Sequence, residues 1–145
     1  MKDPIKYIRQ AMINALSGNI SYNGANVPVY GRVPSSASEP YIKIYSVQTN
    51  EADQNADEFI TETLTRIEVV TAFDSDSGGE LEVNTIVNDI LVIIRTRSSG
   101  YFDLSSNDFH VYTCVNEGVT YLEDDRNDKT YFTSIIDISN RVLQV

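Results

Sequence analysis

The chain has 145 residues, 41% of them hydrophobic, and a formal net charge of -10. This length suits a single domain spanning residues 1–145, and the hydrophobic content is sufficient for a folded core. Eleven basic residues against twenty-one acidic ones oppose the neutralisation of phosphates that supplies most non-specific nucleic-acid affinity. Composition therefore excludes tight DNA or RNA binding as an expected function, although a surface past which DNA slides without sticking would benefit from negative charge.

The chain has one cysteine, Cys114, so the sequence excludes an intrachain disulfide and a four-cysteine zinc site. We expect folding in a reducing cytoplasm. The N-terminal residues lack the apolar core of a signal peptide, and no stretch approaches the roughly 20 apolar residues that a membrane-spanning helix needs. The sequence therefore predicts a soluble protein that is neither exported nor bound to a membrane.

The N-terminal residues predict a helix. Asp3 can cap it, Pro4 suits the first helical position and Gly18 can end it. Its apolar stripe comprises Ile5, Ile8, Met12 and Leu16. Two short strands, Ile20–Tyr22 and Val27–Val33, should follow, joined by a tight turn at Asn23-Gly24.

A long hairpin is expected in the middle of the chain, from Tyr41–Thr49 and Phe59–Phe73. The second strand alternates, and its expected buried face comprises Phe59, Thr61, Thr63, Thr65, Ile67, Val69, Thr71 and Phe73. This strand of about fifteen residues is much longer than the usual five or six, so we expect its outer end to project beyond the sheet that the helices cover. The tip, Asn50–Glu58, is acidic; a solvated flexible loop is the favoured interpretation, and contact with a neighbouring subunit is the alternative.

A second helix is expected at Glu80–Arg95, after a turn in which Ser77 and Glu80 could form a capping box. The remaining sequence suggests strands at Tyr101–Leu104, Phe109–Asn116, Val119–Glu123 and Lys129–Val142. The predicted fold class is α+β, with an antiparallel β-sheet, a long protruding hairpin and two α-helices packed against the sheet.

We expect no catalytic residue, no metal ligand and no cofactor. His110 and Cys114 lie four apart on a predicted strand, about 13 Å at roughly 3.3 Å per residue, too far for a nucleophile and its base. Residues 74–79 resemble the start of a calcium loop, but position twelve is Thr85 where a bidentate Glu is needed. Carboxylates at residues 123–128 fit a solvated hairpin tip. With one His and loop-borne carboxylates, an enzyme is the least favoured class.

Several segments together resemble the tail-terminator (tail-completion) proteins of tailed bacteriophages, over most of the chain and in order and pattern. They are an N-terminal helix, the segment Val27-Pro28-Val29-Tyr30, the strand opener Glu39-Pro40-Tyr41-Ile42-Lys43-Ile44, the strand ending Ile67-Glu68-Val69-Val70-Thr71, and a Gly-containing turn into an Ile/Val/Leu-rich helix.

This resemblance implies a virion structural protein, assembled in the host bacterial cytoplasm, that forms a ring, typically a hexamer. The ring would sit at the head-proximal end of the tail or in the neck, terminate the tail tube and join it to the head connector or portal-adaptor proteins. DNA would pass through its channel without specific binding. We expect subunit or partner contacts at Glu51, Asp53, Asp57, Glu58 and Phe59, all on the predicted hairpin arm.

Two alternatives stay open at this stage. A connector or adaptor ring in the neck of a short-tailed phage would differ from a tail terminator only in its partners. A cytoplasmic ligand-binding or regulatory module with a ferredoxin-like sheet is a different class, which a stable monomer with a defined ligand pocket would favour.

Overall fold

The computed structural model describes residues 1–52, 57–96 and 102–145, which form two α-helices, eight strands and one short 3₁₀ turn. Their bounds in chain order are α1 Ile5–Leu16, β1 Ser21–Tyr22, β2 Ala25–Asn26, β3 Val29–Tyr30, β4 Tyr41–Glu51, β5 Phe59–Asp74, α2 Leu81–Ile94, the 3₁₀ turn Ser105–Asn107, β6 Phe109–Val111, β7 Val115–Arg126 and β8 Lys129–Gln144. The α+β class with two helices is therefore confirmed.

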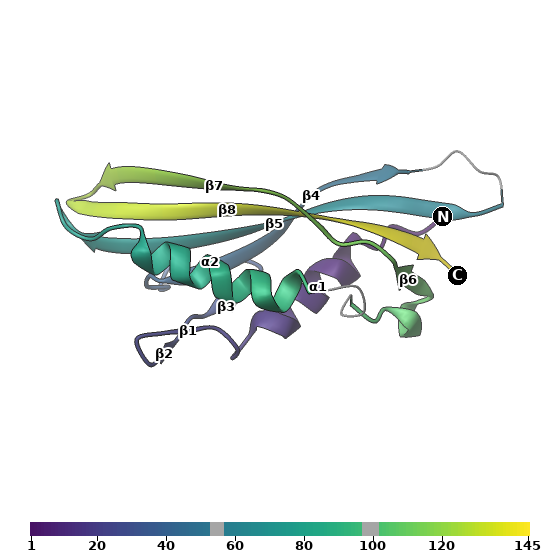
Figure 1. Ribbon diagram of the computed structural model, residues 1–145, viewed down its shortest axis with the longest axis horizontal. Coiled ribbons are helices and arrows are strands. Elements are labelled where there is room, and N and C mark those ends of the chain that lie inside the picture. The colour runs from purple at the N-terminus through teal and green to yellow at the C-terminus, as the bar shows by residue number, and fades with distance from the viewer. Residues whose placement is uncertain (53–56, 97–101) are drawn as a thin grey trace.

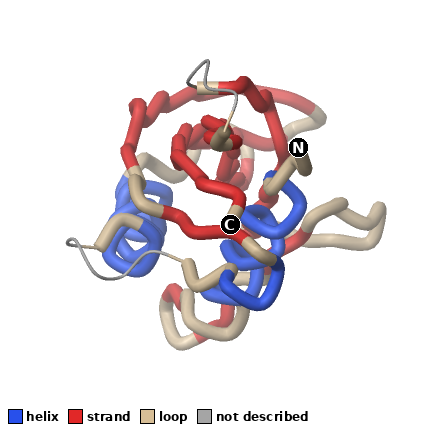
Figure 2. Tube along the Cα trace, turned by 90° about the vertical axis from the view of Figure 1, so that its right-hand side faces the viewer, coloured by secondary structure: helices blue, strands red, loops and turns tan. Residues whose placement is uncertain are grey.

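Six strands form one sheet in the order β3-β4-β5-β8-β6, with β7 also paired to β8. The pairs are antiparallel except β3 with β4, which are parallel. The sheet is therefore mixed, and the prediction of a purely antiparallel sheet was wrong. Both helices lie on one face of the sheet (Figure 1). Seen end-on, the strands curl around the long axis of the molecule (Figure 2).

The central pair is β5 with β8, antiparallel from Phe59 opposite Gln144 to Asp74 opposite Lys129. β5 is as long as the sequence predicted, but it has a partner along its whole length. The expected projection of β5 beyond the sheet is therefore not confirmed. On its other side β5 pairs with β4 over most of the length of β4, with a bulge between Ser46 and Gln48.

The far edge of β8 is covered by two successive strands, β6 and β7. A single strand from Phe109 to Asn116 was therefore a wrong prediction. Between β6 and β7 the chain stays tied to β8: Tyr112 N donates to the carbonyl oxygen of Arg141 at 3.1 Å, and Asn140 Nδ2 donates to the carbonyl oxygen of Thr113 at 3.0 Å. β7 is also longer than the predicted strand 119–123.

The core lies between the helices and the sheet. The predicted alternation of β5 is confirmed from residue 61 to residue 69; Val70 is then buried as well as Thr71, and Phe59 is 38% exposed. Each buried Leu, Ile, Val, Met or Phe contributes roughly 1.5–3 kcal/mol. The fully buried side chains that join helices to sheet include Ile8, Met12 and Leu16 of α1, Ile86 and Ile90 of α2, and Ile42, Ile44, Ile67, Ile136 and Ile138 of the sheet.

The predicted turn at Asn23-Gly24 is confirmed, whereas two predicted short strands are not. The Asn23-Gly24 turn is confirmed, with φ of 51° and 77°. The strand expected at Val27–Val33 is wrong, since only Val29–Tyr30 is a strand and it pairs parallel to β4. The strand expected at 101–104 is also not seen: residue 101 lies outside the described residues, and 102–104 are not strand.

The predicted capping box of α2 is wrong. Glu80 is the N-cap residue and makes no side-chain cap bond. The hydroxyl of Ser77 instead donates to the carbonyl oxygen of Asp74 at 2.7 Å, inside the turn that precedes the helix. Because the Ser77 hydroxyl is hydrogen-bonded within this turn, it does not cap the helix.

Gly78 is required by that turn. Its φ is +87°, and a Cβ placed on it would overlap the ring of Phe73, lying 2.8 Å from the Cβ of that residue. Phe73 is held in turn edge-on against Phe132, with ring centroids 5.8 Å apart. A side chain at residue 78 would therefore strain the backbone and displace a partly buried ring.

We expect Gly78→Ala to lower the free energy of unfolding by about 2–4 kcal/mol, from positive-φ strain and overpacking together. Gly79→Ala is the matched control, because its Cβ would meet nothing within 4 Å and its φ is not positive; the control should change stability by less than about 0.5 kcal/mol. Urea unfolding curves measure both. Equal midpoints for the two variants would contradict this account of the turn.

Candidate functional site: a polar groove on the helix-free face

The face of the sheet opposite the helices carries three ion pairs. Arg66 of β5 binds Asp137 of β8 through two contacts, Nε to Oδ1 at 2.8 Å and Nη2 to Oδ2 at 3.2 Å. Hydrogen bonds to Asp137 and Tyr45 raise the pKa of the Arg66 guanidinium. The other pairs are Arg141 with Glu62 at 3.2 Å and Arg126 with Asp124 at 2.7 Å.

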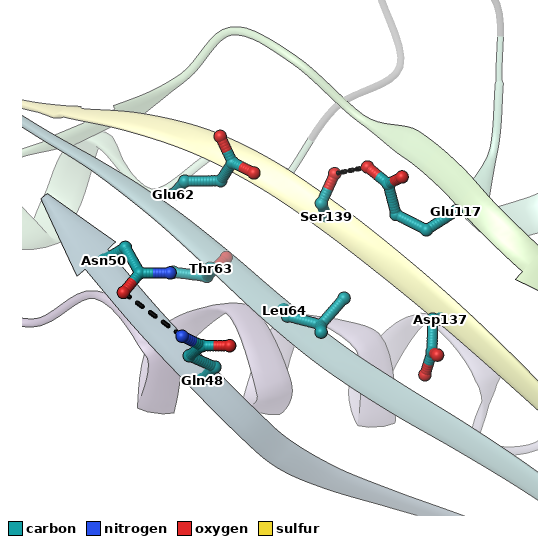
Figure 3. A pocket seen from close by; sticks show the side chains of 8 residues that line it. All are labelled: Gln48, Asn50, Glu62, Thr63, Leu64, Glu117, Asp137 and Ser139. Atoms are coloured by element: carbon teal, nitrogen blue, oxygen red, sulfur yellow. Dashed lines mark hydrogen bonds between the residues drawn. The ribbon is translucent and has the colours of Figure 1, made fainter. Parts of the chain in front are cut away.

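This face is hollowed by a groove of two adjoining lobes. The first, of about 290 Å³, is lined by Gln48, Asn50, Glu62, Thr63, Leu64, Glu117, Asp137 and Ser139 (Figure 3). The second, of about 270 Å³, shares Glu62, Glu117 and Ser139 with the first and adds Tyr112, Thr113, Val115 and Arg141. Strands β4, β5, β7 and β8 all contribute, so only the folded sheet brings these residues together.

Two bulges shape the groove. One lies in β4 directly before Gln48, and the other lies in β7, where the register shift between Asn116 and Gly118 leaves Glu117 as the extra residue. Bulges re-aim side chains and are over-represented beside functional sites. Asn116 Oδ1 accepts from the N–H of Gly118 at 3.0 Å, and Ser139 Oγ donates to Glu117 Oε1 at 2.6 Å.

The interface residues predicted from sequence lie elsewhere, at one end of the sheet. Glu51 ends β4, Glu58 precedes β5 and Phe59 begins it, and all three are exposed. Asp53 lies outside the described residues, as do residues 54–56 of the predicted hairpin tip, whereas Asp57 is described and has an interaction partner. The chain termini are nearby, because Phe59 pairs with Gln144 and the Thr49 hydroxyl donates to Asp3 Oδ1 at 3.2 Å.

His110 and Cys114 do not form a site. His110 is exposed on β6, whereas Cys114 is 2% exposed and its thiol contacts the carbonyl oxygen of Ile94 at 3.6 Å. Cys114 is therefore a small buried residue of the core. In the described parts of the chain no cluster of three or more His, Cys, Asp or Glu side chains could hold a metal ion, and neither helix is long and apolar enough to span a membrane.

Comparison with known proteins gave no relative: a scan against protein-family models and a search of curated proteins found no match for this chain. A functional assignment therefore rests on the geometry of the sheet, its edges and its groove.

Burial raises the pKa of the Cys114 thiol, and only the thiolate is nucleophilic. At pH 8 we expect the native protein to react with a disulfide reagent on the order of 100-fold more slowly than the urea-unfolded chain, where a thiol ionises near pH 8.5. Because the folded pKa is raised, stability should also fall as the pH rises from about 8 to 10.

The control for that measurement is a Cys114→Ala protein carrying Ser36→Cys, since Ser36 is exposed. Its thiol should react equally fast folded and unfolded, and its stability should lack the alkaline decline attributed to Cys114. Fast labelling of Cys114 in the native protein would contradict the buried position.

Proposed function

We propose that the protein is a virion structural subunit that forms a ring of its own copies at the head-proximal end of a phage tail or in the neck, as tail-terminator proteins do. The observation that carries this proposal is that, among the described residues, the sheet has two edges with unpaired stretches, and these stretches lie at the same height along the strand direction. One edge is β4 beyond its short pairing with β3, and the other is the outer side of β6 and β7.

The shared height follows from the register of the strands. Two rows of paired residues cross the sheet: Val111, Val142, Thr61 and Glu51 form one, and Gly118, Asp137, Arg66 and Tyr45 form the other. The β6–β7 edge between residues 111 and 118 therefore lies level with the β4 edge between residues 45 and 51. Copies joined edge to edge would meet without an axial step, as a flat ring requires.

Strand direction favours the same arrangement. β4, β5, β8 and β7 are successively antiparallel, so β7 runs opposite to β4. Rotation about an axis parallel to the strands preserves their directions, and β7 of one copy would therefore meet β4 of the next as an antiparallel pair. Such a heterologous contact generates a ring when the rotation closes.

Each edge presents one exposed apolar residue at the level where the two would meet. Val115 of β7 is 44% exposed and Val47, the bulged residue of β4, is 40% exposed. Val115, Ser139, Leu64 and Gln48 form one row of paired residues across the sheet. Val47 directly precedes Gln48, so Val47 and Val115 lie at nearly the same height along the strands. Pairing β7 with another β7 is less favourable, because it would bring the acidic side chains of two copies together.

The helix-free face suits the wall of a channel through which DNA passes. Its three arginines, Arg66, Arg126 and Arg141, are each held by a carboxylate. Cations that are already neutralised release few counterions from DNA and bind phosphates weakly. In this arrangement the helices face outward, and Glu51, Glu58 and Phe59 lie at an axial end, where a tail tube or head connector would dock.

The two edges can be tested separately by Val47→Lys and Val115→Lys. Wild-type protein should form closed rings with an open centre, detected by light scattering across a concentration series and by negative-stain electron microscopy. Each variant alone should stay monomeric, because each loses one half of the contact. A 1:1 mixture should form a heterodimer and nothing larger, since one intact β4 edge and one intact β7 edge remain.

Leu81→Lys is the matched control, because Leu81 is 74% exposed on α2, away from both edges; it should assemble like the wild type. Rings from either edge variant alone would contradict the proposed contact. If the wild type is a monomer at every concentration, the next experiment is to test whether it co-assembles with tail tubes or portal complexes.

A ligand-binding module is the second candidate, and the two-lobed groove is the observation that favours it. Its expected ferredoxin-like form does not match the structure, because the element order differs from the β-α-β-β-α-β order of that sheet. A monomer that binds a defined small molecule in the groove would favour this class over the ring.

A further inference from the structure

The groove on the helix-free face has an uncompensated negative charge. Of its three carboxylates, Asp137 has both oxygens engaged by Arg66, and Glu62 binds Arg141. Glu117 accepts only the neutral hydroxyl of Ser139, and within the described part of the chain it has no cationic partner. Glu117 is exposed, so it is the one carboxylate of the groove that faces solvent without a cationic partner among the described residues.

The backbone positions Glu117 in this groove. Glu117 is the extra residue of the β7 bulge, and its side chain lines the groove together with residues of β5 and β8. Ser139, which is 7% exposed, holds one of its carboxylate oxygens by a hydrogen bond. The second oxygen accepts no hydrogen bond from any described residue. A group with a compact charge and several donors fits one available oxygen better than the planar fork of a guanidinium, which needs both.

Apolar and amide groups lie on either side of Glu117. Leu64 forms part of the first lobe and Val115 part of the second, so a short methylene stem has an apolar surface in either direction. Gln48 Nε2 donates to Asn50 Oδ1 at 3.2 Å, which leaves the carbonyl oxygen of Gln48 as an additional acceptor. The groove thus combines one free anionic oxygen, one neutral acceptor and an apolar wall.

We propose that this groove binds a primary alkylammonium group, with the ammonium on Glu117 and the stem against Leu64 or Val115. The group is either that of a free aliphatic amine or the side chain of a lysine from another polypeptide. All residues of the site belong to one copy of the chain, although Val115 also lies at the contact proposed between copies.

Ligand-observed saturation-transfer NMR tests the site, because it detects weak binding to a monomer or a large assembly. The probe is n-butylammonium chloride, titrated against the full-length protein at pH 7. We expect saturable binding that Glu117→Gln weakens about threefold to fivefold, the range of an exposed ion pair. Glu117→Gln keeps a carbonyl oxygen for Ser139, so the bulge should stay folded, which circular dichroism checks.

Two further variants keep the test specific. Glu123→Gln removes the same charge from the same strand outside the groove and should change affinity less than twofold. Leu64→Lys puts an ammonium of the protein's own into the groove and should abolish binding while all carboxylates stay. Non-saturable binding, or equal losses from Glu117→Gln and Glu123→Gln, would overturn the proposal, since a diffuse attraction to an acidic surface would then explain the signal.

The source of the ammonium group is distinguished by a second probe, the tripeptide acetyl-Gly-Lys-Gly-amide. Affinity at least tenfold above that of n-butylammonium would assign the groove to a lysine of another chain. Equal affinity would assign it to a free amine. Failure of both probes would overturn the site and leave the ring proposal untouched.

Discussion

The pairing of β5 with β8 is the constraint on which the rest of the structure depends. These two strands are matched from Phe59 to Asp74 and from Gln144 to Lys129 without a break in register. Every other strand of the main sheet attaches to one of them directly or through β4. Their buried face contacts both helices, and their opposite face supplies Arg66, Asp137 and the floor of the groove.

The two proposed functions depend on different parts of the sheet, namely its edges and its helix-free face. The edges are open at matching heights, each with an exposed valine, which supports a heterologous contact between copies. The helix-free face has its arginines neutralised and a groove with one unpaired carboxylate. Val115 belongs to both the proposed contact and the groove, whereas Val47 belongs only to the contact and Leu64 only to the groove, so Val47→Lys and Leu64→Lys test the two proposals separately.

The features that the sequence predicted well are local. The alternation of residues 61–69, the helical stripe of α1 and the Asn-Gly turn each depend on residues close together in the chain. The capping box failed because the Ser77 hydroxyl found a nearer acceptor in the carbonyl of Asp74. The strand at Phe109–Asn116 failed because its middle residues bond to Asn140 and Arg141, which no local pattern reveals.

The groove was missed for the same reason. Glu117 looked like one more acid in an acidic chain, and only a bulge opposite β8 brings it beside Ser139 and Glu62. The Asn-x-Gly spacing at residues 116–118 was the one available signal, because Asn readily bonds a backbone N–H two residues on and Gly allows φ of 148°. Of the residues that the sequence singled out, Glu51, Glu58 and Phe59 lie instead at the end of the sheet.

The central claim, that copies join through β4 and β7 around a channel, is tested most directly by a cryo-electron microscopy map of the wild-type assembly. The account predicts a closed ring with an open centre, in which Val115 of each subunit lies beside Val47 of the next and the helices face outward. A ring joined through α1 or α2, or one with the helices lining the channel, would contradict it.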